Sequence, residues 1–164
     1  MDLNRSSSAS QREEGTHSYE PQLCAIETFL HAQIPITEAM GVRVESYDTQ
    51  QLVLTAPLKS NYNHLGTAFG GSLAAIATLA GYGFLWLELG DPKAHIVIRD
   101  SAISYRQPVR GDIRAICRRP EDAQLMAFKN GFARSGKARI ALHVSIEENN
   151  KVAVEFKGTF VAMK

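Results

Sequence analysis

The chain has few of the residues on which metal, redox or nucleic-acid chemistry depends. Its 164 residues include two cysteines and one tryptophan, and 18 lysines and arginines nearly balance 17 aspartates and glutamates, for a net charge of +1. Cys24 and Cys117 lie far apart, without a CxxC spacing or nearby histidines at metal-ligand spacing. This pattern argues against a structural metal and is typical of a reducing compartment. The basic residues are dispersed, so we expect neither a nucleic-acid partner nor a cofactor.

The first twenty residues have too little apolar surface to fold or to serve as a secretory signal. Residues 6–10 read Ser-Ser-Ser-Ala-Ser, and charges of both signs follow. We therefore expect residues 1–20 to form a disordered tail and residues 21–164 to form one domain, which is long enough for a single sizeable core. Without a signal sequence, the protein is expected in the cytoplasm.

One long stretch, residues 65–87, contains no Asp, Glu, Lys or Arg. The stretch opens on glycines and continues in Ala, Leu, Ile and aromatic residues, which predicts a helix over about residues 69–89, ending at Gly90. A helix that is apolar on every face must be buried. Its length also suits a membrane span. The internal glycines and the lack of a flanking Lys/Arg cluster argue against that alternative, so we expect no membrane partner.

The remaining chain alternates between short helical and strand patterns. Before the buried helix we expect a helix over 21–31, a turn over 36–40 closed by Gly41, and strands over 42–47 and 52–56. After it we expect strands over 94–106 and 111–117, a polar segment over 120–136 that is helical around 123–128, and strands over 137–147 and 151–163. The last two strands alternate apolar and polar residues, so one face is buried. This order predicts an α+β fold, in which an antiparallel sheet of about five to six strands wraps around one long central helix.

Two segments carry a family resemblance. Residues 63–71 read Asn-His-Leu-Gly-Thr-Ala-Phe-Gly-Gly at the mouth of the buried helix, and residues 100–112 combine a Pro and a Gly-Asp in a strand-turn-strand segment. With the element order, they resemble the hotdog fold of the thioesterase superfamily over residues 35–163. More narrowly, the chain is similar to the thioesterase domain found fused behind an acetyltransferase in some bacterial proteins. The resemblance implies hydrolysis of acyl-CoA or acyl carrier protein thioesters by a homodimer or a dimer of dimers.

The sequence departs from the phenylacetyl-type members of that superfamily at two positions. Those members carry His just before the Gly pair and an acidic residue eight positions after its first Gly, where this chain has Phe69 and Thr78. No Asp or Glu lies between Asp48 and Glu88. The base of a hydrolase must therefore come from elsewhere. A non-catalytic acyl-thioester-binding or scaffold protein and a hotdog hydratase or dehydratase stay open as alternatives.

Hydrolysis of a thioester needs donors aimed at the carbonyl oxygen and a base for the attacking water. Glycines at a helix N-terminus offer free amide N–H groups, so Gly70 is the predicted oxyanion donor, with Gly71 beside it. Alternatively, the two glycines serve only close packing. The resemblance makes Asn63 the residue that orients the water, and the alternative is that it caps its own loop.

Asp100 is the predicted general base, because Ile96 and Ile98 set one apolar phase of their strand and Ile103 and Tyr105 set the other. A β-bulge at such a reversal re-aims a side chain, and a partly buried carboxylate there suits base chemistry. The alternative is an ion pair with a neighbouring arginine. The predicted substrate-binding residues are Asn61, His64, Gly71, Ser72 and Tyr82. The basic residues that could meet the phosphates of CoA or an acidic carrier-protein surface are Arg106, Arg118, Arg119 and Lys129.

Overall fold

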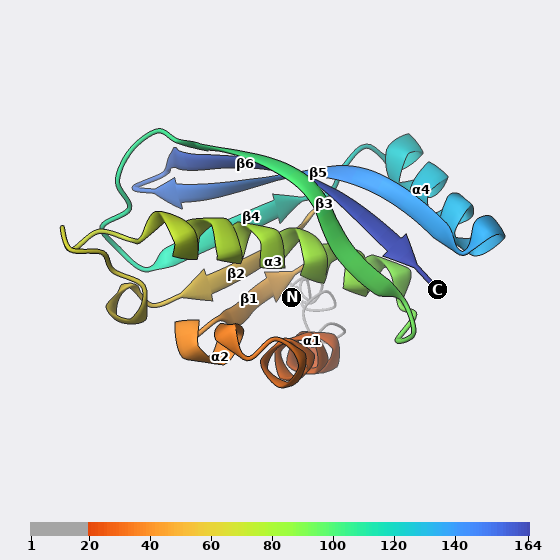
Figure 1. The fold of residues 1–164 in the computed structure, drawn as a ribbon, viewed down its shortest axis with the longest axis horizontal. Helices are drawn as coiled ribbons and strands as arrows, with labels where there is room; N and C mark the ends of the chain where they lie inside the picture. The colour runs from red at the N-terminus through yellow and green to blue at the C-terminus, as the bar shows by residue number, and fades with distance from the viewer. Residues whose placement is uncertain (1–19) are drawn as a thin grey trace, which may run out of the picture.

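The computed structural model describes residues 20–164, so the expectation of a disordered tail lies outside the described residues except at Glu20. The elements are α1 (Glu20–Gln33), α2 (Ile36–Met40), β1 (Arg43–Tyr47), β2 (Gln51–Ala56), a 3-10 turn (Leu58–Ser60), α3 (Gly70–Leu89), β3 (His95–Tyr105), β4 (Ile113–Arg118), α4 (Asp122–Ser135), β5 (Lys137–Glu148) and β6 (Lys151–Met163) (Figure 1). Gly41 ends α2 in the left-handed conformation, as predicted.

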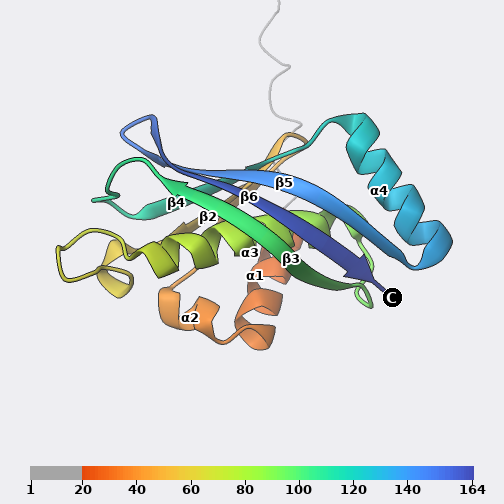
Figure 2. The same ribbon diagram turned by 45° about the horizontal axis from the view of Figure 1, so that its top comes forward.

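Within this range the six strands form one sheet in the order β1-β2-β4-β5-β6-β3, and every neighbouring pair is antiparallel. The sheet curves around α3, while α1 and α2 lie beside that helix on the same side (Figures 1 and 2). Strand alternation directs the apolar residues of β5 and β6 toward α3 and their polar residues to the outer face. This is the hotdog architecture that the resemblance implied.

The central helix accounts for the charge-free stretch. It begins after Phe69, whose backbone is extended, and ends at Gly90, which is left-handed at φ 58° and donates its N–H to the Trp86 carbonyl at 3.2 Å. It contacts β2, β3, β4, β5 and β6. A Cβ added at Gly81 would lie 2.5 Å from the Phe160 ring, so the ring packs directly on helix backbone. Length and composition would also fit a membrane span, but packing inside the sheet explains both.

The edge strand β3 pairs with β6 alone, and its register shifts between Ile98 and Asp100. Arg99 is the extra residue, which confirms the bulge expected from the reversal of apolar phase. Most side chains of β3 are exposed, including Val97, Ile98 and Tyr105, which are 47%, 37% and 52% exposed. The protomer therefore leaves a long and partly apolar sheet edge open to solvent.

Helix α4 is longer than the sequence pattern predicted, because it continues to Ser135 and is closed by Gly136 in the left-handed conformation. Its buried residues Leu125, Phe128 and Phe132 share one face. β4 pairs with β5 only at residues 144–146 of β5, so the first half of β5 lacks a strand neighbour on that side. α4 covers this gap and packs on β5, and Gln124 Nε2 donates to the Ala141 carbonyl at 3.1 Å.

Candidate functional site

The loop of residues 57–69, which leads into α3, is held in place by Asn61. This side chain is 3% exposed, and its Nδ2 donates to the carbonyls of Met40 and Pro57, both at 2.8 Å. The backbone carbonyl of Asn61 accepts the Phe69 N–H at 2.7 Å. Within residues 20–164 its Oδ1 has no hydrogen-bond partner. Asn61 thus anchors the loop and leaves one buried acceptor that suits a water molecule.

Asn63 braces the next turn of the same loop. Its Oδ1 accepts the N–H groups of Leu65 and Thr67 at 2.9 and 3.3 Å, and its Nδ2 donates to Thr67 Oγ1 at 3.0 Å. The other Nδ2 contact, with the Ala68 carbonyl, is long at 3.5 Å. The loop-capping role weighed from the sequence is therefore present. One N–H of the amide is held only weakly and stays available to a ligand.

The first turn of α3 presents free donors. Among the described residues no acceptor receives the N–H of Gly70 or of Gly71, and no side chain caps the helix. Gly71 is exposed and Gly70 half-buried. Unpaired amides at the positive end of a helix dipole form a site for negative charge. The two amides that the sequence singled out therefore have no acceptor among the described residues, while the Phe69 ring packs directly on Gly71.

One neighbour of this turn was missed from the sequence. The Tyr105 hydroxyl, at the end of β3, donates to the Gly70 carbonyl at 3.0 Å. Its ring atoms lie 3.6 Å from where a Cβ on Gly70 would stand, which is ordinary van der Waals contact. Tyr105 fixes the helix start against the edge strand. Its place on the apolar phase of β3 was visible, but a contact between residues 35 apart in the chain was not.

Large apolar side chains surround the helix start. Tyr62, Leu65 and Phe69 are 64%, 73% and 56% exposed, and Tyr105 adds a fourth exposed ring. Clustered exposed apolar groups of this kind mark surfaces that bind a ligand or another protein. We name these four residues the apolar rim. It borders the free amides of α3.

The other predicted substrate-binding residues are spread over the loop before α3 and along the helix itself. His64 is exposed on the loop and Ser72 is half-buried in the first turn of α3. Tyr82 lies roughly 18 Å along the helix from Gly70, where its ring stacks on Phe29 at 6.4 Å between centroids and burial raises its pKa.

Burial also raises the pKa of the Cys117 thiol to about 12. That thiol is buried in β4 and has no thiolate character at neutral pH.

The bulge places Asp100 on the outer face of β3. Its side chain is 65% exposed, and its nearest cation is Arg99, with 3.7 Å between Asp100 Oδ2 and Arg99 Nε. Five residues of strand separate it from Tyr105, a distance of roughly 17 Å. Within one protomer the structure therefore does not bring Asp100 and Gly70 together.

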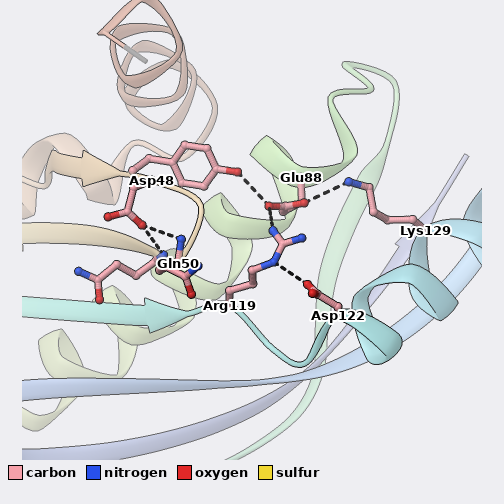
Figure 3. Close-up of polar contacts among 8 residues, drawn as sticks. Asp48, Gln50, Glu88, Arg119, Asp122 and Lys129 are labelled. Carbon is pink, nitrogen blue, oxygen red and sulfur yellow. Dashed lines mark hydrogen bonds and ion pairs between the residues drawn. The ribbon is translucent and has the colours of Figure 1, made fainter. Parts of the chain in front are cut away.

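The one carboxylate on α3 lies at the opposite end of the helix, roughly 27 Å from Gly70. The Glu88 side chain is 7% exposed and accepts hydrogen bonds from Arg119 Nη1 at 2.7 Å, Lys129 Nζ at 3.1 Å and the Tyr47 hydroxyl at 3.0 Å (Figure 3). Arg119 also pairs with Asp122 at 3.2 Å. This cluster, which we name the Glu88 clamp, ties α3 to β1, α4 and the segment between β4 and α4.

The basic residues singled out from the sequence are engaged in ion pairs. Arg119 and Lys129 belong to the Glu88 clamp, Arg118 binds Glu147, and Arg106 binds Glu155. Each is therefore committed to a carboxylate of its own chain. Within residues 20–164 no three His, Cys, Asp or Glu side chains come together as a metal site requires.

A curved antiparallel sheet wrapped on a long helix with a glycine start defines a hotdog protein. A model of the family described as "Putative thioesterase (yiiD_Cterm)" matches residues 23–164, and the chain belongs to this family.

Three solved structures have the same fold. A protein of unknown function from Chlorobaculum tepidum TLS is 36% identical, with 87% of this chain and 94% of that chain covered at a TM-score of 0.81. A Shewanella oneidensis protein described as a "putative thioesterase" is 29% identical, with 88% of this chain and 99% of that chain covered at a TM-score of 0.77. A thioesterase from Haemophilus influenzae is 16% identical and shares the fold, with 87% of this chain and 90% of that chain covered at a TM-score of 0.63.

Proposed function

We propose that the protein hydrolyses acyl thioesters, with the Gly70 amide as the principal oxyanion donor. The observation that carries the proposal is the pair of free amides at the start of α3, bordered by the apolar rim. Membership of a family described as thioesterases supports it. The alternative of a non-catalytic acyl-binding protein is favoured by the absence of a carboxylate near Gly70 within the described residues of one protomer.

In the proposed reaction, water attacks the thioester carbonyl carbon and gives up a proton to a base. The carbonyl oxygen becomes negative and accepts hydrogen bonds from the N–H groups of Gly70 and Gly71. These hydrogen bonds strengthen as the negative charge develops. Collapse of the tetrahedral intermediate breaks the carbon–sulfur bond. The thiolate takes up the proton, and the products are a carboxylic acid and a thiol. The weakly held N–H of Asn63 orients the reactants.

The proposed enzyme is a homodimer joined through β3. An eleven-residue edge strand with exposed Val97 and Ile98 is a template for pairing with another strand, and antiparallel pairing of two such edges makes a closed two-fold dimer. The end of one β3, with Tyr105 and the free amides, then lies beside the partner strand. Asp100 is roughly 17 Å from its own site and lies on the outer face of the sheet opposite Thr159, and pairing of two β3 edges keeps that face turned away from α3 in both subunits, so the proposal leaves the base unassigned.

Proline at position 70 tests the oxyanion donor, because proline has no N–H. Gly70 is the first residue of α3, where proline is well tolerated, and the extended backbone of Phe69 (φ −68°, ψ 133°) suits a residue before proline. Gly70→Pro removes a donor that has no partner in the fold, so we expect folding to be preserved and the kcat for acyl-CoA hydrolysis to fall about a hundredfold or more.

Gly70→Ala is the matched control. It keeps the N–H, and its Cβ would meet Tyr105 at an ordinary 3.6 Å, so it should retain most activity. Thiol release would be measured over acyl-CoAs of increasing chain length, with thermal unfolding alongside. Equal activity in the proline and alanine variants would refute the oxyanion assignment. No thiol release from any thioester by the wild type would leave the acyl-binding alternative.

A further inference from the structure

Two grooves lie on the outer face of the sheet, away from α3. The first has a volume of about 380 Å³ and is lined by Arg99, Asp100, Gln124, Arg139, Ala141 and Thr159, together with Ile140. The second has a volume of about 420 Å³, and its polar lining comprises Ser104, Arg118, His143, Ser145, Glu155 and Lys157. Volumes of this size are typical of small-molecule sites.

The two grooves are consecutive along the same three strands. Thr159 of β6 is opposite Asp100 of β3 and Ala141 of β5, and two residues earlier on β6 Lys157 is opposite Ala102 and His143. Residues two apart on a strand share a face and are about 7 Å apart. The grooves are therefore adjacent on the outer face of β3, β6 and β5, and we name the two together the outer furrow.

The outer furrow holds cations without partners. Within residues 20–164, neither the Arg139 nor the Lys157 side chain has a hydrogen-bond or ion-pair partner, and the Arg99 side chain has only the 3.7 Å contact with Asp100. The carboxylate in the second groove, Glu155, is bound to Arg106. Unpaired cations in a concave surface concentrate the field that attracts anions.

The β3 bulge contributes to this arrangement. It inserts Arg99 as an extra residue and sets Asp100 and Ala102 on the outer face in register with Thr159 and Lys157. A guanidinium group matches phosphate geometry with two parallel hydrogen bonds, and an ammonium serves as a point charge for phosphate. Ala141 lines the first groove and Ala102 the second, so each groove has a small apolar side chain beside its cations. Phosphate groups joined to a flat apolar ring would fit both features.

We propose that the outer furrow binds the phosphate-bearing adenosine end of CoA, with Arg139 and Lys157 as its main ligands. This inference rests on the proposed function and deepens it, because it names CoA as the thiol carrier. Ser104 of the furrow directly precedes Tyr105, whose hydroxyl contacts Gly70 on the other side of the strand. Past Tyr105 the chain stays on β6, where the Ala153 carbonyl accepts the N–H groups of Arg106 and Gln107, so a pantetheine arm connects the furrow with the free amides only by crossing the sheet beyond these residues.

Titration calorimetry of adenosine 3′,5′-bisphosphate binding to the full chain tests the furrow without any hydrolysis. The variants are Arg139→Gln, Lys157→Gln and the double substitution, with Lys151→Gln as control at the exposed β5–β6 turn. We expect the wild type and the control to bind equally, and the double variant to bind roughly tenfold more weakly or worse. Added salt should weaken binding to the wild type. Equal binding by the wild type and the double variant would overturn the proposal.

Kinetics with two substrates separate the furrow from the catalytic proposal. An acyl N-acetylcysteamine thioester carries the same reacting group as acyl-CoA but no phosphate. The double variant should raise KM for acyl-CoA roughly tenfold at unchanged kcat and leave kcat/KM for the truncated thioester unchanged. Equal losses on both substrates would count against the furrow.

Two further outcomes have distinct meanings. If the double variant impairs hydrolysis of an acyl carrier protein thioester while the bisphosphate does not bind the wild type, the furrow is a protein-docking surface and the CoA assignment is wrong. If no thioester is hydrolysed but the bisphosphate binds in the expected order of variants, the proposed function fails and the furrow stands.

Discussion

The two ends of α3 differ in how their polar groups are satisfied. At the C-terminal end, Gly90 caps the helix, and the Glu88 carboxylate has three hydrogen-bond donors. A carboxylate at the negative end of a helix dipole is unfavourable alone, so Arg119 and Lys129 are needed to offset it. At the N-terminal end, where an acidic or hydroxyl cap would be favourable, there is none. The chain satisfies the end that holds the fold together and leaves the other end free.

Loss of the clamp should have the largest effect on stability. Glu88→Gln leaves Arg119 and Lys129 facing each other without a carboxylate. Breaking a buried ion pair costs about 3–5 kcal/mol, and because Lys129 is 44% exposed, we expect about 2–3 kcal/mol in the free energy of unfolding. Urea denaturation would measure it, with Glu121→Gln, an exposed residue, as control. Thiol release per folded molecule should stay unchanged, and a parallel loss of activity would show that the two ends are not independent.

Changing Asn63 should lower activity by a smaller factor and leave the fold intact. Asn63→Asp keeps an oxygen for the N–H groups of Leu65 and Thr67 but removes both N–H donors. We expect stability to change by less than about 1 kcal/mol and kcat to fall roughly tenfold. Asn63→Ala, which removes the loop contacts as well, should lower the melting temperature further. If the aspartate variant is fully active, Asn63 serves only to brace the loop.

Amide hydrogen exchange should show the contrast between the two ends without any substitution. The N–H groups of Gly70 and Gly71 have no acceptor among the described residues, whereas that of Gly90 is bonded to the Trp86 carbonyl. By NMR, the first two should exchange close to the rate of an unprotected peptide, and the third should be slower. A carboxylate product bound with CoA should slow the first two. Slow exchange at Gly70 in the free protein would mean that the helix start is already occupied.

The architecture could be read from the sequence because periodicity and glycine positions reflect local physics. The alternation in β5 and β6, the left-handed glycines after α2 and α3, and the reversal of apolar phase at Asp100 each marked a feature that the structure contains. The reading was least complete at α4, where a polar surface concealed three buried side chains on one face.

The site was only partly predictable, because its remaining contacts join distant parts of the chain. Gly70 and Gly71 were found from their place at a helix start. The Tyr105 contact spans 35 residues and the Lys129–Glu88 pair spans 41, and no local pattern records either. The same limit applies to charge. Arg118 and Arg119 were expected as candidates for binding phosphate but are paired, whereas the side chains of Arg139 and Lys157 have no partner within residues 20–164.

The short ladder between β4 and β5 divides the sheet into two panels, β1-β2-β4 and β5-β6-β3. Only Val144, Ser145 and Ile146 of β5 join the panels, so the joint has few hydrogen bonds with which to resist bending. Helix α4 packs on β5 beside this joint, and α3 contacts strands of both panels. Resistance to bending between the panel with the open edge strand and the panel with the N-terminal hairpin therefore comes from the helix that both panels share more than from the ladder between them.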